Sequence, residues 1–163
     1  MKIKNALNLL QAVIMLQSSD VARNVKFGFM LSYNKRLLEN VQSSFQDAIK
    51  DEAEEAIIQA FEVDRIEMLN KIADKDEHGQ PIVNDGVFKI TDQDAALVKI
   101  RDELLSKHPK AEAAIEHRQN RINELSEEET DVALRKIPLA EWPDLPPDIP
   151  PTILDVVMEM IEA

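Results

Sequence analysis

Apolar residues recur at helical spacing through most of this chain, beginning near its first residue. Within residues 3–17 they form two neighbouring stripes, which give a helix a wide apolar face. We therefore predict a first helix over residues 3–17 that is well buried or docks on another chain. The stripes comprise Ile3, Leu7, Leu10 and Ile14 on one track and Leu9, Val13 and Leu16 on the other.

The longest helical pattern covers residues 29–73, where no proline or glycine interrupts the chain. An unbroken helix of that length would measure roughly 65–70 Å at 1.5 Å per residue. One domain cannot bury such a rod on itself, so the helix either bends near residues 51–55, where acids cluster, or packs on a long partner. Residues 21–31 fit a strand or a helix start, and Gly28 weakens both interpretations. We expect a turn or short extended piece there, with the helix beginning near Phe29.

Residues 81–90 give the clearest β signal. Two short runs rich in β-branched and aromatic residues flank Asn84-Asp85-Gly86, and a loop of about three residues that contains glycine is a common hairpin connection. A two-stranded ribbon is marginal by itself in water. We therefore expect the hairpin to pair with a third strand, either residues 132–136 or the same hairpin of a second subunit.

A second helical arm follows the hairpin. Thr91 precedes Asp94 by three residues, which is the spacing of a capping-box variant. Residues 106–109 interrupt this arm, because the residue before Pro109 avoids helical backbone angles. A new helix is expected from Pro109 onward, since proline suits the first turn of a helix.

The last part of the chain changes in composition, since six of its eight prolines fall within residues 138–151. Proline excludes a helix or a central strand there, so we predict an extended strap followed by a short amphipathic helix of about eleven residues. The strap either covers the helical body of its own chain or lies in a partner's groove. The candidate protein-interaction residues are its apolar side chains: Trp142, Leu145, Ile149, Ile153, Val156, Val157 and Met160.

Charge narrows the choice of partner. The net charge is −12, but residues 1–36 carry +5 and the remainder −17. A body of such negative charge repels nucleic acid and anionic membranes, so we expect protein partners and neither nucleic-acid nor membrane binding. We interpret the basic first segment as an internal charge partner for the acidic helices. The chain has no cysteine, which excludes disulfides and thiolate metal sites.

The sequence contains no nucleotide-binding or hydrolase motif and no pair of histidines at metal-binding spacing. Asp74, Asp76 and His78 imitate the start of a calcium loop. The fifth position of that loop is His78, and its twelfth is Asp85 where a glutamate is needed, so the match is poor. We therefore predict no catalytic, cofactor-binding or metal-binding residues, no cofactor and no enzymatic activity.

These patterns predict a mainly α fold with a small β-hairpin. Two helical arms form a long antiparallel helical hairpin, bent or coiled-coil-like, and a proline-rich C-terminal strap with a short terminal helix packs on it. We divide the chain into a helical domain of residues 1–136, with the hairpin at about 81–90, and a strap with a short helix at residues 137–163. So long a helix implies a homodimer or a place in a larger complex.

The order of elements resembles small proteins of unassigned function that tailed bacteriophages encode. The resemblance covers the lysine-rich start at residues 1–4, the run at residues 24–38, the hairpin at residues 75–90 and an Ile137-Pro138-Leu139 tail that ends in a short acidic helix. The layout is also similar to that of prefoldin-type chaperone subunits, in architecture alone.

The phage resemblance implies a non-enzymatic protein-protein interaction protein, used in virion assembly or as an adaptor. Its expected partners are phage or bacterial host proteins, and its expected location is the bacterial host cytoplasm or the virion. One alternative is an acidic phage-encoded inhibitor of a host defence or nucleic-acid-processing complex. Another is a carboxylate-dependent hydrolase that uses clustered residues such as Glu52, Glu54, Glu55 and Glu62.

Overall fold

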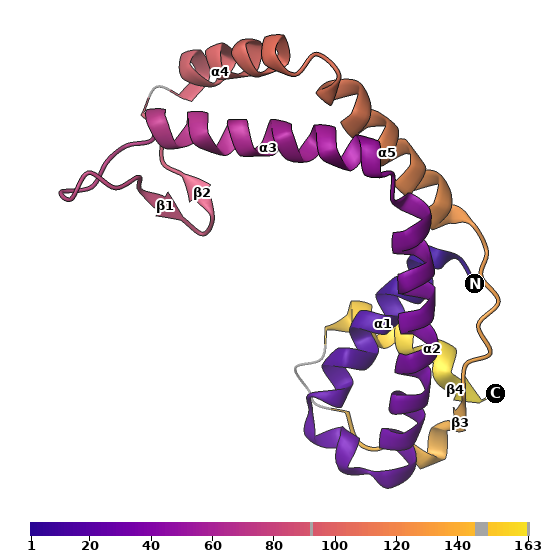
Figure 1. The fold of residues 1–163 in the computed structure, drawn as a ribbon. Helices are drawn as coiled ribbons and strands as arrows, with labels where there is room; N and C mark the ends of the chain where they lie inside the picture. The colour runs from indigo at the N-terminus through magenta and orange to yellow at the C-terminus, as the bar shows by residue number, and fades with distance from the viewer. Residues whose placement is uncertain (92, 146–149, 163) are drawn as a thin grey trace. The chain divides into compact units, whose positions relative to one another are not determined.

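The computed structural model describes residues 1–91, 93–145 and 150–162. The fold is mainly α with a small antiparallel hairpin, as the sequence predicts (Figure 1). The chain forms two compact units, one of Met1–Ile49 with Arg121–Ala163 and one of Lys50–Asn120. The helices are α1 (Ile3–Gln17), α2 (Val25–Ile49), α3 (Glu52–Ile72), α4 (Gln93–Lys107), α5 (Ala111–Glu127) and α6 (Pro151–Val157). The strands are β1 (Val83–Asn84), β2 (Val87–Phe88), β3 (Ile137–Pro138) and β4 (Ile161–Glu162).

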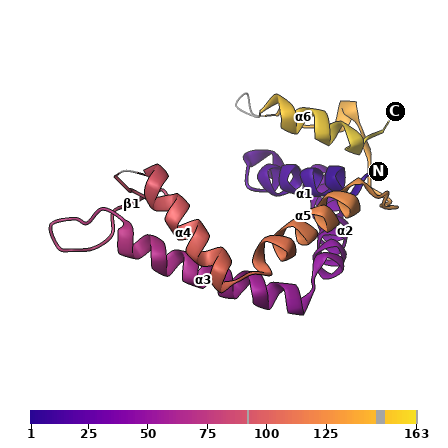
Figure 2. The ribbon, with the colours of Figure 1, turned by 90° about the horizontal axis from the view of Figure 1, so that it is seen from above.

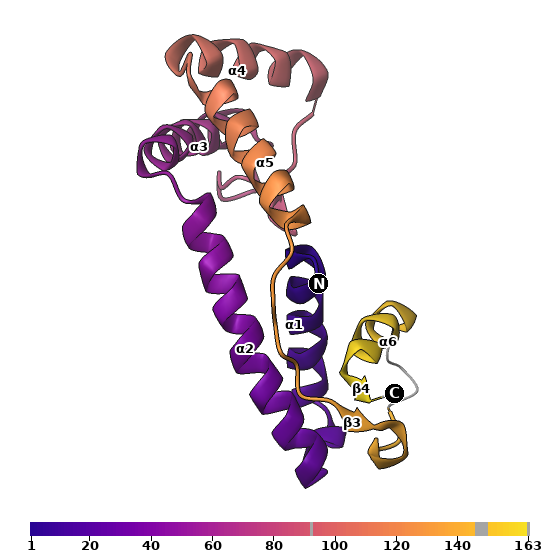
Figure 3. The ribbon, with the colours of Figure 1, turned by 90° about the vertical axis from the view of Figure 1, so that its right-hand side faces the viewer.

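In the first unit, α1 lies between α2 and α6 (Figure 2; Figure 3). The predicted first helix is confirmed. Its buried face centres on the stripe of Leu9, Val13 and Leu16, whereas Ile14 of the other stripe is exposed. The largest side chains of the core come from all three helices and the turn that follows α6: Leu9, Leu10, Leu16, Phe27, Met30, Leu31, Leu38, Val157 and Met160.

The helix α2 begins at Val25, one turn before the predicted start near Phe29. The side-chain oxygen of Asn24 accepts a hydrogen bond from the Phe27 amide at 3.1 Å, so this residue caps the helix earlier than the apolar pattern indicated. A short 3₁₀ turn, Asp20–Arg23, precedes the cap. Gly28 fits because a Cβ at this position would lie only 2.4 Å from the Ala22 carbonyl oxygen.

The long helical pattern is interrupted within the predicted region of residues 51–55, since α2 has ended at Ile49 and α3 begins at Glu52. The Asp51 carboxylate accepts hydrogen bonds from the amides of Ala53 and Glu54 at 3.0 and 3.1 Å. A side chain that caps a new helix in this way replaces the bonds that would continue the old one. The predicted interruption at Pro109 is also confirmed, since α4 ends at Lys107 and α5 starts at Ala111.

In the second unit, α3 and α4 lie side by side, and the chain reverses between them through β1 and β2 (Figure 1). Their small core consists of Leu69, Ile90, Ile100 and Leu104. The hairpin loop has two residues, Asp85 and Gly86, in place of the predicted three. Both have positive φ, 49° and 80°, which is the signature of a type I′ turn.

The expected third strand from residues 132–136 is wrong, because these residues form no strand. Within the described residues, the sheet of β1 and β2 has two strands. The backbone of Asp74 instead closes the base of the hairpin. It donates to the Lys89 carbonyl at 2.8 Å and accepts from the Ile82 amide at 2.9 Å. Pairing with the hairpin of a second subunit stays a prediction.

The C-terminal segment packs on the first unit of its own chain. The Trp142 ring meets the Phe27 ring edge-on, with centroids 5.0 Å apart. The terminal helix is shorter than the predicted eleven residues: α6 ends at Val157, and a 3₁₀ turn, Met158–Met160, follows. The reason is that the chain then extends as β4 and pairs in parallel with β3, which places Ile161 beside Ile137.

A buried amide ties the segment after α5 to α2. The Asn34 side chain is completely buried; its nitrogen donates to the Arg135 carbonyl at 2.9 Å, and its oxygen accepts from the Arg135 amide at 2.7 Å. Both polar groups of the side chain and both backbone groups of Arg135 are therefore satisfied.

Gly28→Ala should destabilise the first unit, although alanine normally stabilises a helix relative to glycine. The added methyl group meets the Ala22 carbonyl, so we expect a loss of about 1–3 kcal/mol from overpacking. Urea unfolding of the variant measures the change in stability. Ser43→Ala, at an exposed site of α2, is the control. A Gly28→Ala protein as stable as the parent would contradict the close approach.

Asn34→Leu should loosen the segment around Arg135, because two backbone groups lose their buried partners. We expect a loss of about 1–3 kcal/mol for each group left unsatisfied. Trypsin should also cleave after Arg135 or Lys136 faster than in the parent. Mass spectrometry of the early fragments checks this, with Asn5→Leu, at an exposed site of α1, as the control.

Candidate functional site

The structure places most of the predicted interaction residues in, or packed against, the chain's own core. Val157 and Met160 are 2% and 0% exposed. Trp142, Leu145, Ile153 and Val156 are half-buried against the same core, and Ile149 lies outside the described residues. These side chains are thus packed in cis, and an accessible site has to be sought elsewhere on the first unit.

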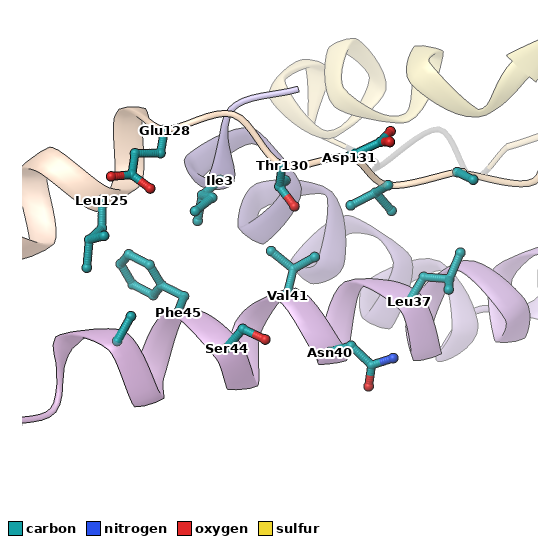
Figure 4. Close-up of a pocket in the computed structure, with 13 residues that line it drawn as sticks. Ile3, Leu37, Asn40, Val41, Ser44, Phe45, Leu125, Glu128, Thr130 and Asp131 are labelled. Atoms are coloured by element: carbon teal, nitrogen blue, oxygen red, sulfur yellow. The ribbon is translucent and has the colours of Figure 1, made fainter.

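A groove of about 570 Å³ runs along the second half of α2 (Figure 4). Its opposite wall is formed by the start of α1, the end of α5 and the residues that follow α5. In Figure 4, Ile3 and Leu125 point across the space toward Phe45. The lining residues are Ile3, Leu37, Asn40, Val41, Ser44, Phe45, Ala48, Leu125, Glu128, Thr130, Asp131, Val132 and Ala133.

The floor of the groove follows from the spacing of apolar residues on α2. Leu37, Val41 and Phe45 recur at intervals of four, which places them in one row along the helix. The fully buried core of α2 ends at Leu38. Beyond that point the row is only half-buried, so it presents carbon surface that the chain's own core does not cover.

Backbone pairing between residues far apart in the sequence builds the opposite wall. The Ile3 amide donates to the Glu128 carbonyl at 2.9 Å, and the Thr130 amide donates to the Met1 carbonyl at 2.8 Å. The Met1 nitrogen donates in turn to the Thr130 carbonyl at 3.1 Å. These bonds hold the start of the chain against the end of α5 and fix Ile3 at the edge of the groove.

Glu127 adds an ionic tie at the same place. Its carboxylate pairs with Lys2 at 2.7 Å and also with Lys4. The hydrogen bonds from Lys2 and Lys4 lower the pKa of Glu127 to about 2. The same interaction with Glu127 raises the pKa of Lys2. Lys2 and Lys4 thus act as internal charge partners, as the sequence predicts for the basic first segment.

The rim of the groove keeps a negative charge. Five carboxylates lie within residues 124–131, and the ion pairs of Lys2 and Lys4 are with Glu127. Glu128 and Asp131 are exposed, and among the residues that the structure describes neither forms an ion pair. An apolar floor beneath free carboxylates suits an apolar side chain that has a cation beside it.

The second unit uses its histidines and carboxylates to join helices. Asp64 of α3 contacts Lys107 at 2.6 Å and His108 at 2.5 Å, and these hydrogen bonds lower the pKa of Asp64. Glu54, also on α3, pairs with His117 of α5. The two histidine pairs could not be predicted from the sequence, since partners more than forty residues apart leave no local signal.

The aspartates that imitate a calcium loop serve as turn acceptors. The Asp76 carboxylate accepts from the amides of His78 and Gln80 at 2.9 and 2.8 Å. The Asp74 carboxylate accepts from the Thr91 amide and hydroxyl at 3.1 and 2.9 Å. In the described part of the chain, no group of three or more His, Asp or Glu side chains is arranged to hold a metal ion.

Comparison with protein-family models, with curated proteins and with solved structures finds no match to this chain. A separate search of the described helices finds none with both the length and the apolar character of a membrane span.

The pair of Glu127 with Lys2 and Lys4 should stabilise the protein in a pH-dependent way. Because the pKa of Glu127 falls from 4.5 to about 2 on folding, the contribution is complete above pH 4.5 and is lost as the pH falls toward 2. Glu127→Gln should therefore lower the urea midpoint at about pH 6 and change it little near pH 2. Glu124→Gln, at an exposed site on the same helix, is the control. An equal effect of Glu127→Gln at both pH values would contradict the assignment.

Proposed function

We propose that this chain is a non-enzymatic protein-protein interaction protein of the phage type, acting in virion assembly or as an adaptor. Its groove along α2 receives an apolar side chain of a protein partner. The observation that carries the proposal is the row of Leu37, Val41 and Phe45, which is half-buried and lines a cavity of about 570 Å³. The phage setting rests on the resemblance in sequence layout alone.

The groove has the features of a protein-binding surface. Its floor combines aliphatic carbon with one aromatic ring, and its rim is polar, which is the usual division between the core and the edge of an interface. The floor belongs to a regular helix, and the opposite wall is held by backbone hydrogen bonds. A partner would thus meet a largely pre-formed site and would lose little free energy in ordering it.

A second candidate is the acidic inhibitor of a host defence or nucleic-acid-processing complex. The carboxylates of Glu128 and Asp131 at the groove favour it, together with the net charge of −12. Salt distinguishes the two functions, because binding through an acidic surface weakens steeply as ionic strength rises. A complex held mainly by the apolar floor loses only the part of its binding that the rim carboxylates supply, so it weakens less over the same range.

Photo-crosslinking from inside the groove tests the proposal. A benzophenone side chain at Ala48, which lines the groove, should form a crosslink to protein in living bacterial cells. The same side chain at Gln46, exposed on α2 and outside the groove lining, should not. Gel electrophoresis and mass spectrometry identify the products.

The substitution Phe45→Asp should abolish the Ala48 crosslink, because it places a charge on the apolar floor. We expect binding to weaken at least about tenfold, as for the loss of a buried aromatic anchor. Gln46→Asp adds the same charge at the control site. Crosslinks that survive Phe45→Asp, or that form equally from both positions, would contradict binding in the groove.

A further inference from the structure

The first half of α2 carries a second exposed apolar surface. Val25, Phe29 and Tyr33 recur at intervals of four and are 84%, 57% and 45% exposed. Large apolar side chains in a contiguous exposed row commonly mark an interaction site. Cations surround this row, and we refer to the whole surface as the basic-aromatic stripe: Val25, Lys26, Phe29, Tyr33, Arg36 and Arg135.

The cations of the stripe are positioned by the fold. The Arg135 guanidinium lies 4.8 Å from the centre of the Phe29 ring, and the hydrogen bonds from Asn34 to the Arg135 backbone hold it there. Arg36 lies on the same side of α2 as Val25 and Phe29 and is exposed; within the described residues it forms no ion pair. Lys26 pairs with Glu141 at 3.0 Å and remains 71% exposed on its side chain.

The stripe and the groove are chemically complementary. The stripe offers aromatic and aliphatic carbon beside arginines, and the groove offers an apolar floor beneath the free carboxylates of Glu128 and Asp131. Two such surfaces attract each other, and their apolar parts gain by leaving water. We infer that the basic-aromatic stripe of one copy of this chain docks in the groove of a second copy. The inference rests on the proposed function of the groove.

The two surfaces cannot meet within one molecule. The stripe occupies α2 up to Arg36, and the groove residues on the same helix start at Leu37. The helix α2 runs without interruption for 25 residues, so its first half cannot fold back onto its second half. The contact therefore joins different copies. A second copy is favoured over an unrelated partner because this chain itself supplies both complementary surfaces.

Docking of this kind is head-to-tail. Each copy offers one stripe and one groove, so the contact leaves a free stripe at one end of a pair and a free groove at the other. Such contacts build open chains of subunits, or rings where the rotation closes. The association should grow with protein concentration and weaken with salt.

Sedimentation equilibrium of the whole protein tests the inference. At about 0.05 M salt the parent should have a mass above the 18.5 kDa of one chain, rising with concentration, and should approach one chain at about 0.5 M salt. Phe29→Asp, which blocks the stripe, and Phe45→Asp, which blocks the groove, should each be monomeric. Gln46→Asp, outside both surfaces, should behave as the parent. Circular dichroism and urea midpoints confirm that each variant is folded.

An equimolar mixture of the two blocked variants is the decisive measurement. Phe29→Asp retains an intact groove and Phe45→Asp an intact stripe, so the mixture should form a one-to-one complex and nothing larger. Neutralising the rim with Glu128→Gln and Asp131→Asn in an otherwise unchanged chain should flatten the salt dependence of association.

Three outcomes would overturn self-docking: a parent that stays monomeric at all concentrations, variants that associate like the parent, or a mixture that remains monomeric. The crosslinking experiment from Ala48 judges the groove separately. A crosslink to a different protein, with a monomeric parent, would keep the proposed function and reject a second copy as the occupant. An absence of crosslinks together with a monomeric parent would reject both.

Discussion

The pair of hydrogen bonds between the Asn34 side chain and the Arg135 backbone is the constraint on which the first unit depends. An amide buried to this degree is tolerated only when its donor and its acceptor are both satisfied, and one peptide segment satisfies them together. The position of residue 135 along α2 is thereby fixed. It places the Arg135 guanidinium over Phe29 and directs the chain into β3, two residues later.

The hydrogen bonds between Asn34 and Arg135 also affect how the C-terminal segment packs. Because β3 has a fixed position, β4 has a partner, and the terminal helix ends early so that Ile161 can lie beside Ile137. Trp142 then reaches Phe27, and Met160 enters the core. A segment with so many prolines has few backbone hydrogen bonds of its own to offer. Its order therefore comes from these attachments to the helical body.

Local patterns in the sequence were sufficient for the helices and their breaks. The stripes of residues 3–17 gave the bounds of α1, Pro109 marked the end of α4, and the cluster of acids after Lys50 marked the start of α3. The floor of the groove was partly visible as well, since Val41 and Phe45 lie at helical spacing within the predicted long helix of residues 29–73. Nothing local showed that the helix leaves the core beyond Leu38, because the opposite wall comes from Ile3 and Leu125 at distant positions in the sequence. The amide of Asn34, the pairing of β3 with β4 and the histidine pairs were missed for the same reason: each joins residues distant in sequence.

The second unit combines apolar packing with polar and ionic contacts between its helices. Near the hairpin, Leu69, Ile90, Ile100 and Leu104 form an apolar cluster. Farther along the unit, Asp64 in the middle of α3 contacts Lys107 and His108, and Glu54 at the start of α3 contacts His117. The free energy gained by burying apolar surface decreases on cooling, whereas an ionic contact weakens when salt screens its charges. Cooling should therefore weaken mainly the cluster around Leu69, and high ionic strength mainly the contact between Asp64 and Lys107.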